Sequence, residues 1–287
     1  MNKLIKAIAL MLAVLTVGAA AAACKKAPKP VILAVSFGTS YNDSREKTIG
    51  AIEKALEKAY PAYEIRRAFT ADTIIKILKE RDNIEVDNVK QAMERLVTDG
   101  VKDVIIQPTH VMSGYEYDDV VKEVKAYESK FNSLKIAKTM LTEEADFDAM
   151  AAMIEATTKE YNADGNAIVY MGHGTEHAAN DTYAKLQQKL TAKGMNNYFV
   201  GTVEAEPTVE DVLEAVKAGG YKKVVLIPFM IVCGDHANND MAGDEEDSWK
   251  SIFEAEGFEV ECVLRGLGES TEVQALVVKH CGEVIGK

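Results

Sequence analysis

The sequence predicts an α/β protein of two similar lobes, each a roughly four-stranded parallel sheet flanked by helices. Two observations lead to this fold class. Apolar runs alternate along the chain with helical segments of about 10 to 15 residues, which is the pattern of βαβ units. The two halves of the chain also repeat the same order of elements, which indicates an internal duplication.

The elements of the first half can be placed in order along the chain. Its strands are apolar throughout, as is typical of strands covered on both faces, and its first helix has an apolar stripe at helical spacing. The expected elements are strand 31–37, a helix with the stripe Ile49, Ile52, Leu56 and Ala59, a second strand ending at Phe69 or Thr70, a short extra helix near 71–79, a helix before Gly100, strand 103–108, a fourth strand near 135–141 and a helix near 145–161.

The second half repeats this plan without the extra helix. Residues 89–114 align with 209–234 without a gap, and glycine and proline recur at matching positions. In parallel sheets, ligands bind beyond the carboxyl ends of the strands, so we expect the site in the cleft between the lobes. The expected elements are strand 167–171, the helix after it, a strand ending before Glu204, a helix before Gly220, strand 223–228, a strand near 258–264 and a helix near 271–284.

The chain before the lobes is typical of a targeting segment. Lys3 and Lys6 precede an apolar run that ends in small residues, which indicates a secretory signal peptide. Alanines before Cys24 fit either ordinary cleavage or lipid attachment at Cys24, and a membrane contact is expected only with the lipid. We therefore expect a periplasmic or other extracytoplasmic protein. The predicted division is a signal peptide, a linker, an N-terminal lobe and a C-terminal lobe carrying the metal site, at 1–23, 24–29, 30–162 and 163–287.

Composition excludes several classes of function. A formal charge of −12 over 287 residues argues against a nucleic-acid partner, because phosphate backbones need a basic surface. Four cysteines without a CxxC pair do not predict a disulfide framework or a structural zinc site. GxGxxG and GxxxxGK[ST] patterns are absent, so no nucleotide cofactor is expected.

The duplication provides an internal control for the polar residues at the strand ends. The second half has His173, Glu204 and His236 after three successive strands, where the first half has Phe37, Phe69 or Thr70, and Glu116. The first half makes the same turns without histidine, so the turns do not require it. Two imidazoles and a carboxylate suit Co²⁺, Fe²⁺, Ni²⁺ or Zn²⁺ and leave coordination positions open. The alternative is that each histidine is a turn residue beside glycine.

Other polar residues have weaker interpretations. The turn SFGTSYNDSRE is similar to a phosphate cradle, and we expect it to line the ligand cleft through Ser36, Phe37, Gly38 and Thr39, with Gly174 and Thr175 of the second half. His177 is either a solvent-facing residue near a helix start or a residue beside the site, and His110 either faces the cleft or caps a strand. His280 is expected to be structural. Arg45, Tyr115, Tyr117 and the acidic run 243–249 each have a ligand-contacting alternative and a solvent-facing or packing one.

Three segments carry a family resemblance. VSFGTS, MGHGTEHAAND and PFMIVCGDHANNDMAGDEEDSW resemble the sirohydrochlorin cobaltochelatases of the CbiK type, in the class II chelatase superfamily, and the likeness extends from Pro30 onward. The resemblance implies two α/β lobes around a tetrapyrrole cleft and insertion of Co²⁺ into sirohydrochlorin. It also implies that His173, Glu204 and His236 are the metal-binding and catalytic positions.

The export signal departs from this family, most of whose members are cytoplasmic. An exported protein could act on haem or another tetrapyrrole, or use Fe²⁺. The alternative function is an extracytoplasmic haem, tetrapyrrole or metal carrier without turnover, with His110 as a candidate haem-binding residue. Partners expected are therefore a tetrapyrrole and a divalent metal, and a homo-oligomer is left open.

Overall fold

The computed structural model describes residues 28–286. The predicted signal peptide, Cys24 and most of the predicted linker lie outside this range. Within the described residues, no helix is both long enough and apolar enough to span a bilayer.

The strands of residues 28–286 form two parallel sheets of four strands with the same topology. The first sheet has the order β2-β1-β3-β4 and the second has β6-β5-β7-β8, so each strand of one has a counterpart in the other. This confirms the predicted fold class. The strands are β1 (Val31–Ser36), β2 (Glu64–Phe69), β3 (Asp103–Pro108), β4 (Ser133–Ile136), β5 (Asn166–Gly172), β6 (Tyr198–Thr202), β7 (Lys223–Pro228) and β8 (Glu259–Cys262).

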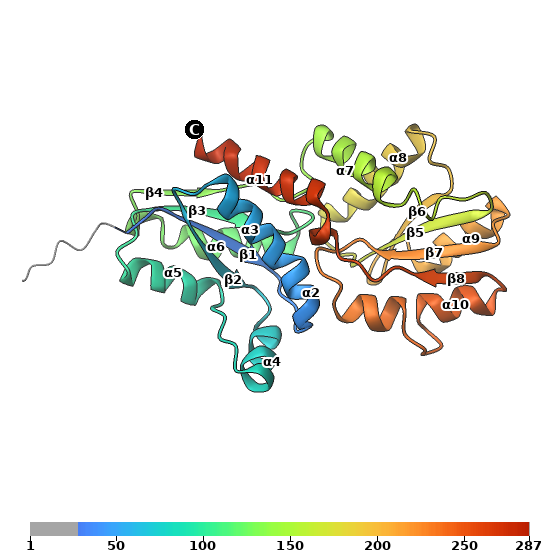
Figure 1. Ribbon diagram of the computed structural model, residues 1–287, viewed down its shortest axis with the longest axis horizontal. Helices are drawn as coiled ribbons and strands as arrows, with labels where there is room; N and C mark the ends of the chain where they lie inside the picture. The colour runs from blue at the N-terminus through green and yellow to red at the C-terminus, as the bar shows by residue number, and fades with distance from the viewer. Residues whose placement is uncertain (1–27, 287) are drawn as a thin grey trace, which may run out of the picture.

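Helices cover both faces of each sheet, and we call each sheet with its helices a lobe (Figure 1). The apolar strands are buried on both sides, as expected for parallel sheets. The principal helices are α2 (Asn42–Lys47), α3 (Ile49–Ala59), α4 (Asp72–Asp82), α5 (Val89–Thr98), α6 (Tyr115–Lys125), α7 (Glu144–Thr157), α8 (Asp181–Ala192), α9 (Val209–Gly219), α10 (Trp249–Ala255) and α11 (Thr271–Ile285).

The last helix of each half packs in part against the other half. In Figure 1, α11 lies beside α3 over the first sheet, whereas α7 lies beside α8 toward the second sheet. One apolar core cluster consequently runs through both lobes, from Ile52 of α3 to Leu186 of α8, and includes residues of α7 and α11. The outer faces have separate clusters, one under α5 and α6 and one under α9 and α10. The predicted boundary between the two lobes at residue 162 stays a prediction, and the contacts between α11 and α3 join segments on either side of it.

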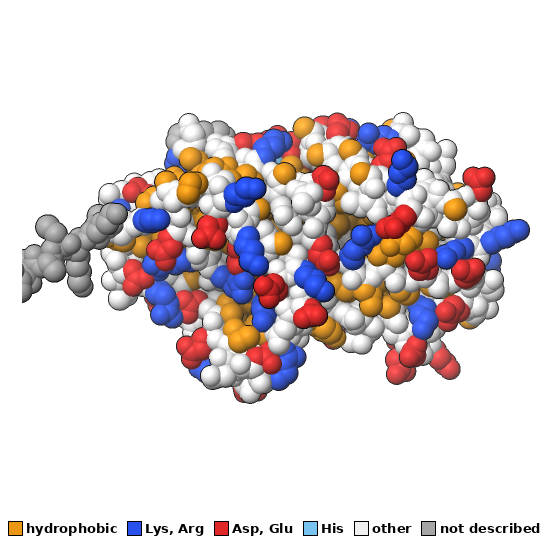
Figure 2. All heavy atoms as spheres, viewed as in Figure 1, with side chains coloured by type: hydrophobic (Ala, Val, Ile, Leu, Met, Phe, Trp, Pro, Cys, Tyr) orange, Lys and Arg blue, Asp and Glu red, His pale blue; other side chains and the backbone are white. Residues whose placement is uncertain are grey.

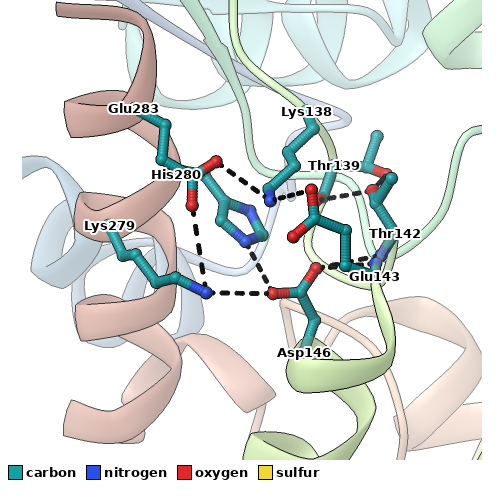
Figure 3. A network of polar contacts seen from close by, with 8 residues as sticks. All are labelled: Lys138, Thr139, Thr142, Glu143, Asp146, Lys279, His280 and Glu283. Atoms are coloured by element: carbon teal, nitrogen blue, oxygen red, sulfur yellow. Dashed lines mark hydrogen bonds and ion pairs between the residues drawn. The ribbon is translucent and has the colours of Figure 1, made fainter. Parts of the chain in front are cut away.

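A buried polar network ties α7 to α11 (Figure 3). The side chains of Asp146 and His280 are both fully buried, and His280 Nε2 lies 3.0 Å from Asp146 Oδ1. The other carboxylate oxygen accepts from the backbone N–H of Glu143 at 2.9 Å, which caps the first turn of α7. His280 is therefore structural, as predicted, and the network stabilises the contact between the crossing helices.

Local details differ from the sequence prediction in three places. The first helix is broken into α2 and α3 at Thr48, whose hydroxyl donates to the carbonyl oxygen of Ser44 and competes with the helical pattern. Ala59, assigned to the apolar stripe, is exposed in the last turn of α3. The fourth strand ends at Ile136, earlier than the predicted 135–141.

Figure 2 shows acidic and basic side chains interspersed over the face that it draws, without a basic stripe there. Cys233, Cys262 and Cys281 are free thiols.

Candidate metal centre in the cleft between the lobes

The carboxyl ends of both sheets open onto one cavity of about 580 Å³. This volume is within the usual range of small-molecule sites. The cavity lies where the chain leaves the central strands β1 and β5 and their neighbours, as the topology rule predicts. It is lined by Ser36, Phe37, Gly38 and Thr39 after β1, by residues 109–112 and 114–116 after β3, and by His173, Gly174, Thr175, Glu204 and His236 of the second lobe.

Equivalent glycines make the turn after the first strand of each lobe. Gly38 has φ +104° and Gly174 has φ +88°, values that side chains rarely adopt. A Cβ at Gly174 would lie 2.8 Å from the backbone nitrogen of Ala205, and a Cβ at Gly38 would lie 2.7 Å from the ring of Phe69. The turn therefore needs its glycine in both lobes but needs histidine in neither, which supports a separate role for His173.

His173 is held by its own turn. Its Nδ1 lies 2.9 Å from the carbonyl oxygen of Gly174, so Nδ1 carries the proton and donates it to that oxygen. The Nε2 lone pair then points away from the backbone and lies 3.7 Å from Glu204 Oε1. A backbone anchor of this kind selects the tautomer that a metal ligand requires.

His236 is anchored in the same way by a carboxylate. It precedes the single π-helical turn η3 (Ala237–Met241), and its Nδ1 lies 2.6 Å from Asp240 Oδ2. Such turns often occur at functional sites. The proton therefore stays on Nδ1, which leaves Nε2 free to bind, and the carboxylate fixes the orientation of the ring.

The three predicted residues come together at one point. The rings of His173 and His236 lie 4.7 Å apart between centroids at 86°, and one ligand atom from each of His173, Glu204 and His236 lies within 4.8 Å of the others. Two neutral imidazoles and a carboxylate give one negative charge and three donors, which suits a divalent first-row ion. The remaining positions are open to a second ligand, as metal transfer requires.

Glu116 of the first lobe also faces this centre, which the sequence analysis did not predict. Partial desolvation in the cleft raises the pKa of the Glu116 carboxyl, although the residue stays exposed; His173 opposes this effect and Glu204 adds to it. Glu116 lines the same cavity as both of these residues. The sequence contains a signal for this position, because the gapless alignment of the two halves pairs Glu116 with His236.

His177 lies outside the metal centre. Its Nδ1 accepts from the N–H of Ala179, its Nε2 lies 3.5 Å from Asp118 Oδ2, and its ring packs against Tyr115 at 4.9 Å. Asp118 and Tyr115 belong to α6 of the first lobe. His177 therefore joins the two lobes beside the cleft, which corresponds to the second of the two alternatives that the sequence left open.

The remaining candidates divide between the cleft and other surfaces. Tyr115 is 57% exposed and lines the cleft, whereas Arg45 lines a separate surface groove beside α3. The hydroxyls of the phosphate-like turn are used internally, because Ser36 accepts from Thr109 and Thr39 accepts from the N–H of Tyr41. His110 lines the cleft and is almost fully buried.

The anchor of His236 gives a first prediction. We expect Asp240→Asn to weaken Co²⁺ binding about 10- to 100-fold, because the ring loses the carboxylate that fixes its tautomer. Titration of metal-free protein with Co²⁺, followed by the visible absorption of the ion, measures this change. Asp244→Asn is the matched control in the same segment, since Asp244 pairs with Lys250 at the surface. Equal affinities in the two variants would contradict the assignment.

Comparison with protein families identifies one model that matches nearly the whole described chain. Residues 30–286 match the family described as cobalt chelatase (CbiK). The sirohydrochlorin cobaltochelatase of Salmonella typhimurium is 37% identical over 257 residues, which cover 90% of this chain and 97% of that protein. The sirohydrochlorin cobaltochelatase CbiKC of Nitratidesulfovibrio vulgaris is 31% identical over 243 residues, covering 84% and 85%.

Solved structures share the fold at low sequence identity. SirB from Bacillus subtilis, determined with Fe³⁺, superposes with a TM-score of 0.60 at 12% identity and covers 89% of this chain and 95% of its own. CbiX, described as the terminal enzyme for biosynthesis of siroheme in denitrifying bacteria, gives 0.52 at 12% identity, with coverage of 88% and 98%. Both likenesses concern the two-lobed fold.

Proposed function

The chain belongs to the CbiK cobalt chelatase family, and from this premise we propose that it inserts Co²⁺ into sirohydrochlorin in the cleft between its lobes. The observation that carries the proposal is the convergence of His173, Glu204 and His236 at the carboxyl ends of the second sheet. Both imidazoles are anchored through Nδ1, so their free nitrogens are directed to a metal and not to the protein. The cavity beside them is large enough for a small organic ligand.

The three ligand atoms explain how Co²⁺ would be held and then transferred. Co²⁺ is a substrate that the two Nε2 atoms and Glu204 would hold with open positions toward the cavity. A bound tetrapyrrole can then exchange its nitrogens for the protein ligands one at a time. Because both reactants are held in one site, the transfer becomes effectively unimolecular.

The proton half requires acceptors for two pyrrole N–H protons for each Co²⁺ inserted. As the metal leaves His173, the Nε2 lone pair is released and can accept one proton, so we assign His173 as the first of these acceptors. Glu204 is freed at the same time. Glu116 stands near both and, with its raised pKa, is a better proton acceptor than an ordinary carboxylate.

The test of this function is an anaerobic insertion assay with purified protein, sirohydrochlorin and Co²⁺, Fe²⁺, Ni²⁺ or Zn²⁺ in turn. We expect the absorption spectrum of the macrocycle to change to that of the cobalt complex with multiple turnovers. His and Glu ligands bind all four ions, so the relative rates, and not the affinities, identify the physiological metal. Stoichiometric binding of sirohydrochlorin or haem without insertion would instead favour the carrier function.

We further propose that the protein acts outside the cytoplasm. Export is supported by the order of residues 1–23, in which basic residues are followed by an apolar run and then by small residues, as in a signal peptide. The rest of the chain matches the family. The mass of the protein recovered from its native cells tests this. A mass corresponding to a start near Cys24 supports export, with an added diacylglycerol mass if Cys24 is lipidated, and an intact N-terminus in a cytoplasmic fraction would contradict it.

A further inference from the structure

His110 is a buried histidine without a partner at the cleft. It follows β3 through Thr109, is 9% exposed and is among the residues that line the cavity. Both of its ring nitrogens are buried, and neither has a hydrogen-bond partner among the described residues. Its backbone is fixed, because its carbonyl oxygen accepts from the N–H of Met140 at 3.0 Å. Buried polar groups without partners are uncommon, so this ring requires an explanation.

Structural stability does not explain His110. His280 is a buried histidine with a packing role; its Nε2 lies 3.0 Å from a carboxylate, and of its two ring nitrogens only Nδ1 lacks a partner. His110 has no such carboxylate, and an unpaired buried polar group destabilises the protein that contains it. The position itself does not demand histidine either, because the equivalent residue of the second lobe is Met230, which lines the same cavity.

The cavity has few other polar groups in the first lobe that are free to bind a ligand. No lysine or arginine is among the described residues that line it, and its charged residues are acidic. In the first lobe, the hydroxyls of Ser36, Thr39 and Thr109 already take part in hydrogen bonds within the protein. Burial lowers the pKa of His110 to about 4, so the ring is neutral near pH 7 and offers one N–H donor and one nitrogen acceptor.

We propose that His110 hydrogen-bonds the tetrapyrrole from the first lobe and positions it against the metal centre of the second lobe. The inference rests on the proposed function, since it requires a tetrapyrrole in this cavity. A free macrocycle carries pyrrole N–H groups and imine-type nitrogens, which match the acceptor and the donor of a neutral imidazole. Binding requires a shift of the ring or of a flexible neighbour such as Met112, and it supplies the partner that the free protein lacks.

The test uses His110→Phe, which removes both polar atoms and retains a flat ring of similar size. We expect metal-free sirohydrochlorin to bind about 10- to 100-fold more weakly in an absorbance titration, because a polar group of the macrocycle loses its partner. Co²⁺ affinity should equal that of the wild type. The melting temperature of the free protein should be unchanged or higher, since an unsatisfied polar group is replaced by an apolar one.

Two further variants separate positioning from a structural role. His280→Phe is the matched control: it should lower the melting temperature and leave the affinity of the folded protein for sirohydrochlorin unchanged. His110→Gln keeps a donor and an acceptor and should restore part of the affinity. A lower melting temperature in His110→Phe without restoration by His110→Gln, or a loss of Co²⁺ affinity, would overturn the positioning role.

The outcomes also separate this inference from the function on which it rests. Wild-type protein that binds sirohydrochlorin, with an equally tight His110→Phe variant, would overturn the inference alone. Wild-type protein that does not bind sirohydrochlorin would overturn the proposed function and the inference together.

Discussion

Replacement of His173 by alanine is expected to abolish cobalt insertion. The variant loses one of the two imidazoles that we propose as metal ligands, and with it the nitrogen that we assign as a proton acceptor. Loss of a ligand should exceed the roughly 10- to 100-fold drop in metal affinity that follows from disturbing a residue behind a ligand. We therefore expect Co²⁺ affinity to fall at least about 100-fold, with no detectable turnover in the sirohydrochlorin assay.

His177→Ala is the matched control for this experiment. His177 lies four residues further along the same segment, contacts Asp118 and Tyr115, and is absent from the metal-binding group. It should retain Co²⁺ affinity and turn over within a few-fold of the wild type. Wild-type-like insertion by His173→Ala would refute the assignment of the centre, and equal losses in both variants would point to a general disturbance of the segment.

Replacement of Asp146 by alanine is expected to cause the largest loss of stability, about 3 to 5 kcal/mol, because it removes a fully buried carboxylate that pairs with His280 and Lys279. His280 would be left buried without its carboxylate, and the first turn of α7 would lose its cap. The helices α7 and α11 join the two lobes, so the loss affects the whole molecule. Urea unfolding followed by circular dichroism measures the change.

Glu144→Gln on the same helix is the control for Asp146→Ala. Its ion pair with Lys189 involves a side chain that is 79% exposed, and such pairs contribute about 0 to 1 kcal/mol. A difference of less than about 1 kcal/mol between the two variants would contradict the structural importance of the buried pair.

The same carboxylate gives a pH dependence with a defined sign. Burial alone would raise the pKa of Asp146, but the N–H of Glu143 and the His280 ring outweigh it and hold the pKa below its usual range. The stability that this group contributes is therefore fully present above the unfolded value of about 3.9 and is lost as the pH falls through the lower folded value. The gap in unfolding free energy between wild type and Asp146→Ala should narrow below about pH 4.

The sequence was sufficient for the fold class, for the duplication, and for choosing three residues that the structure brings together at one point. Apolar strands and amphipathic helices have distinct periods, so the order of elements can be inferred without tertiary information. The comparison of halves separated what the turns require, a glycine at 38 and at 174, from what the second lobe adds, a histidine at 173. Convergence of three residues followed from topology, because the carboxyl ends of neighbouring parallel strands meet at one edge of a sheet.

Tertiary structure decided the features that depend on distance between segments remote in the sequence. No local sequence pattern predicts three of these features. They are the packing of α7 and α11 across the two halves, the buried pair of Asp146 and His280, and the position of Glu116 near His173. The burial of His110 also depends on tertiary packing. The sequence did not decide whether this residue faces the cleft, whereas the structure shows its ring buried at the cavity without a hydrogen-bond partner among the described residues. Periodicity and turn chemistry are local properties of a chain. The burial of a side chain and its hydrogen-bond partners depend instead on the residues that the fold packs against it.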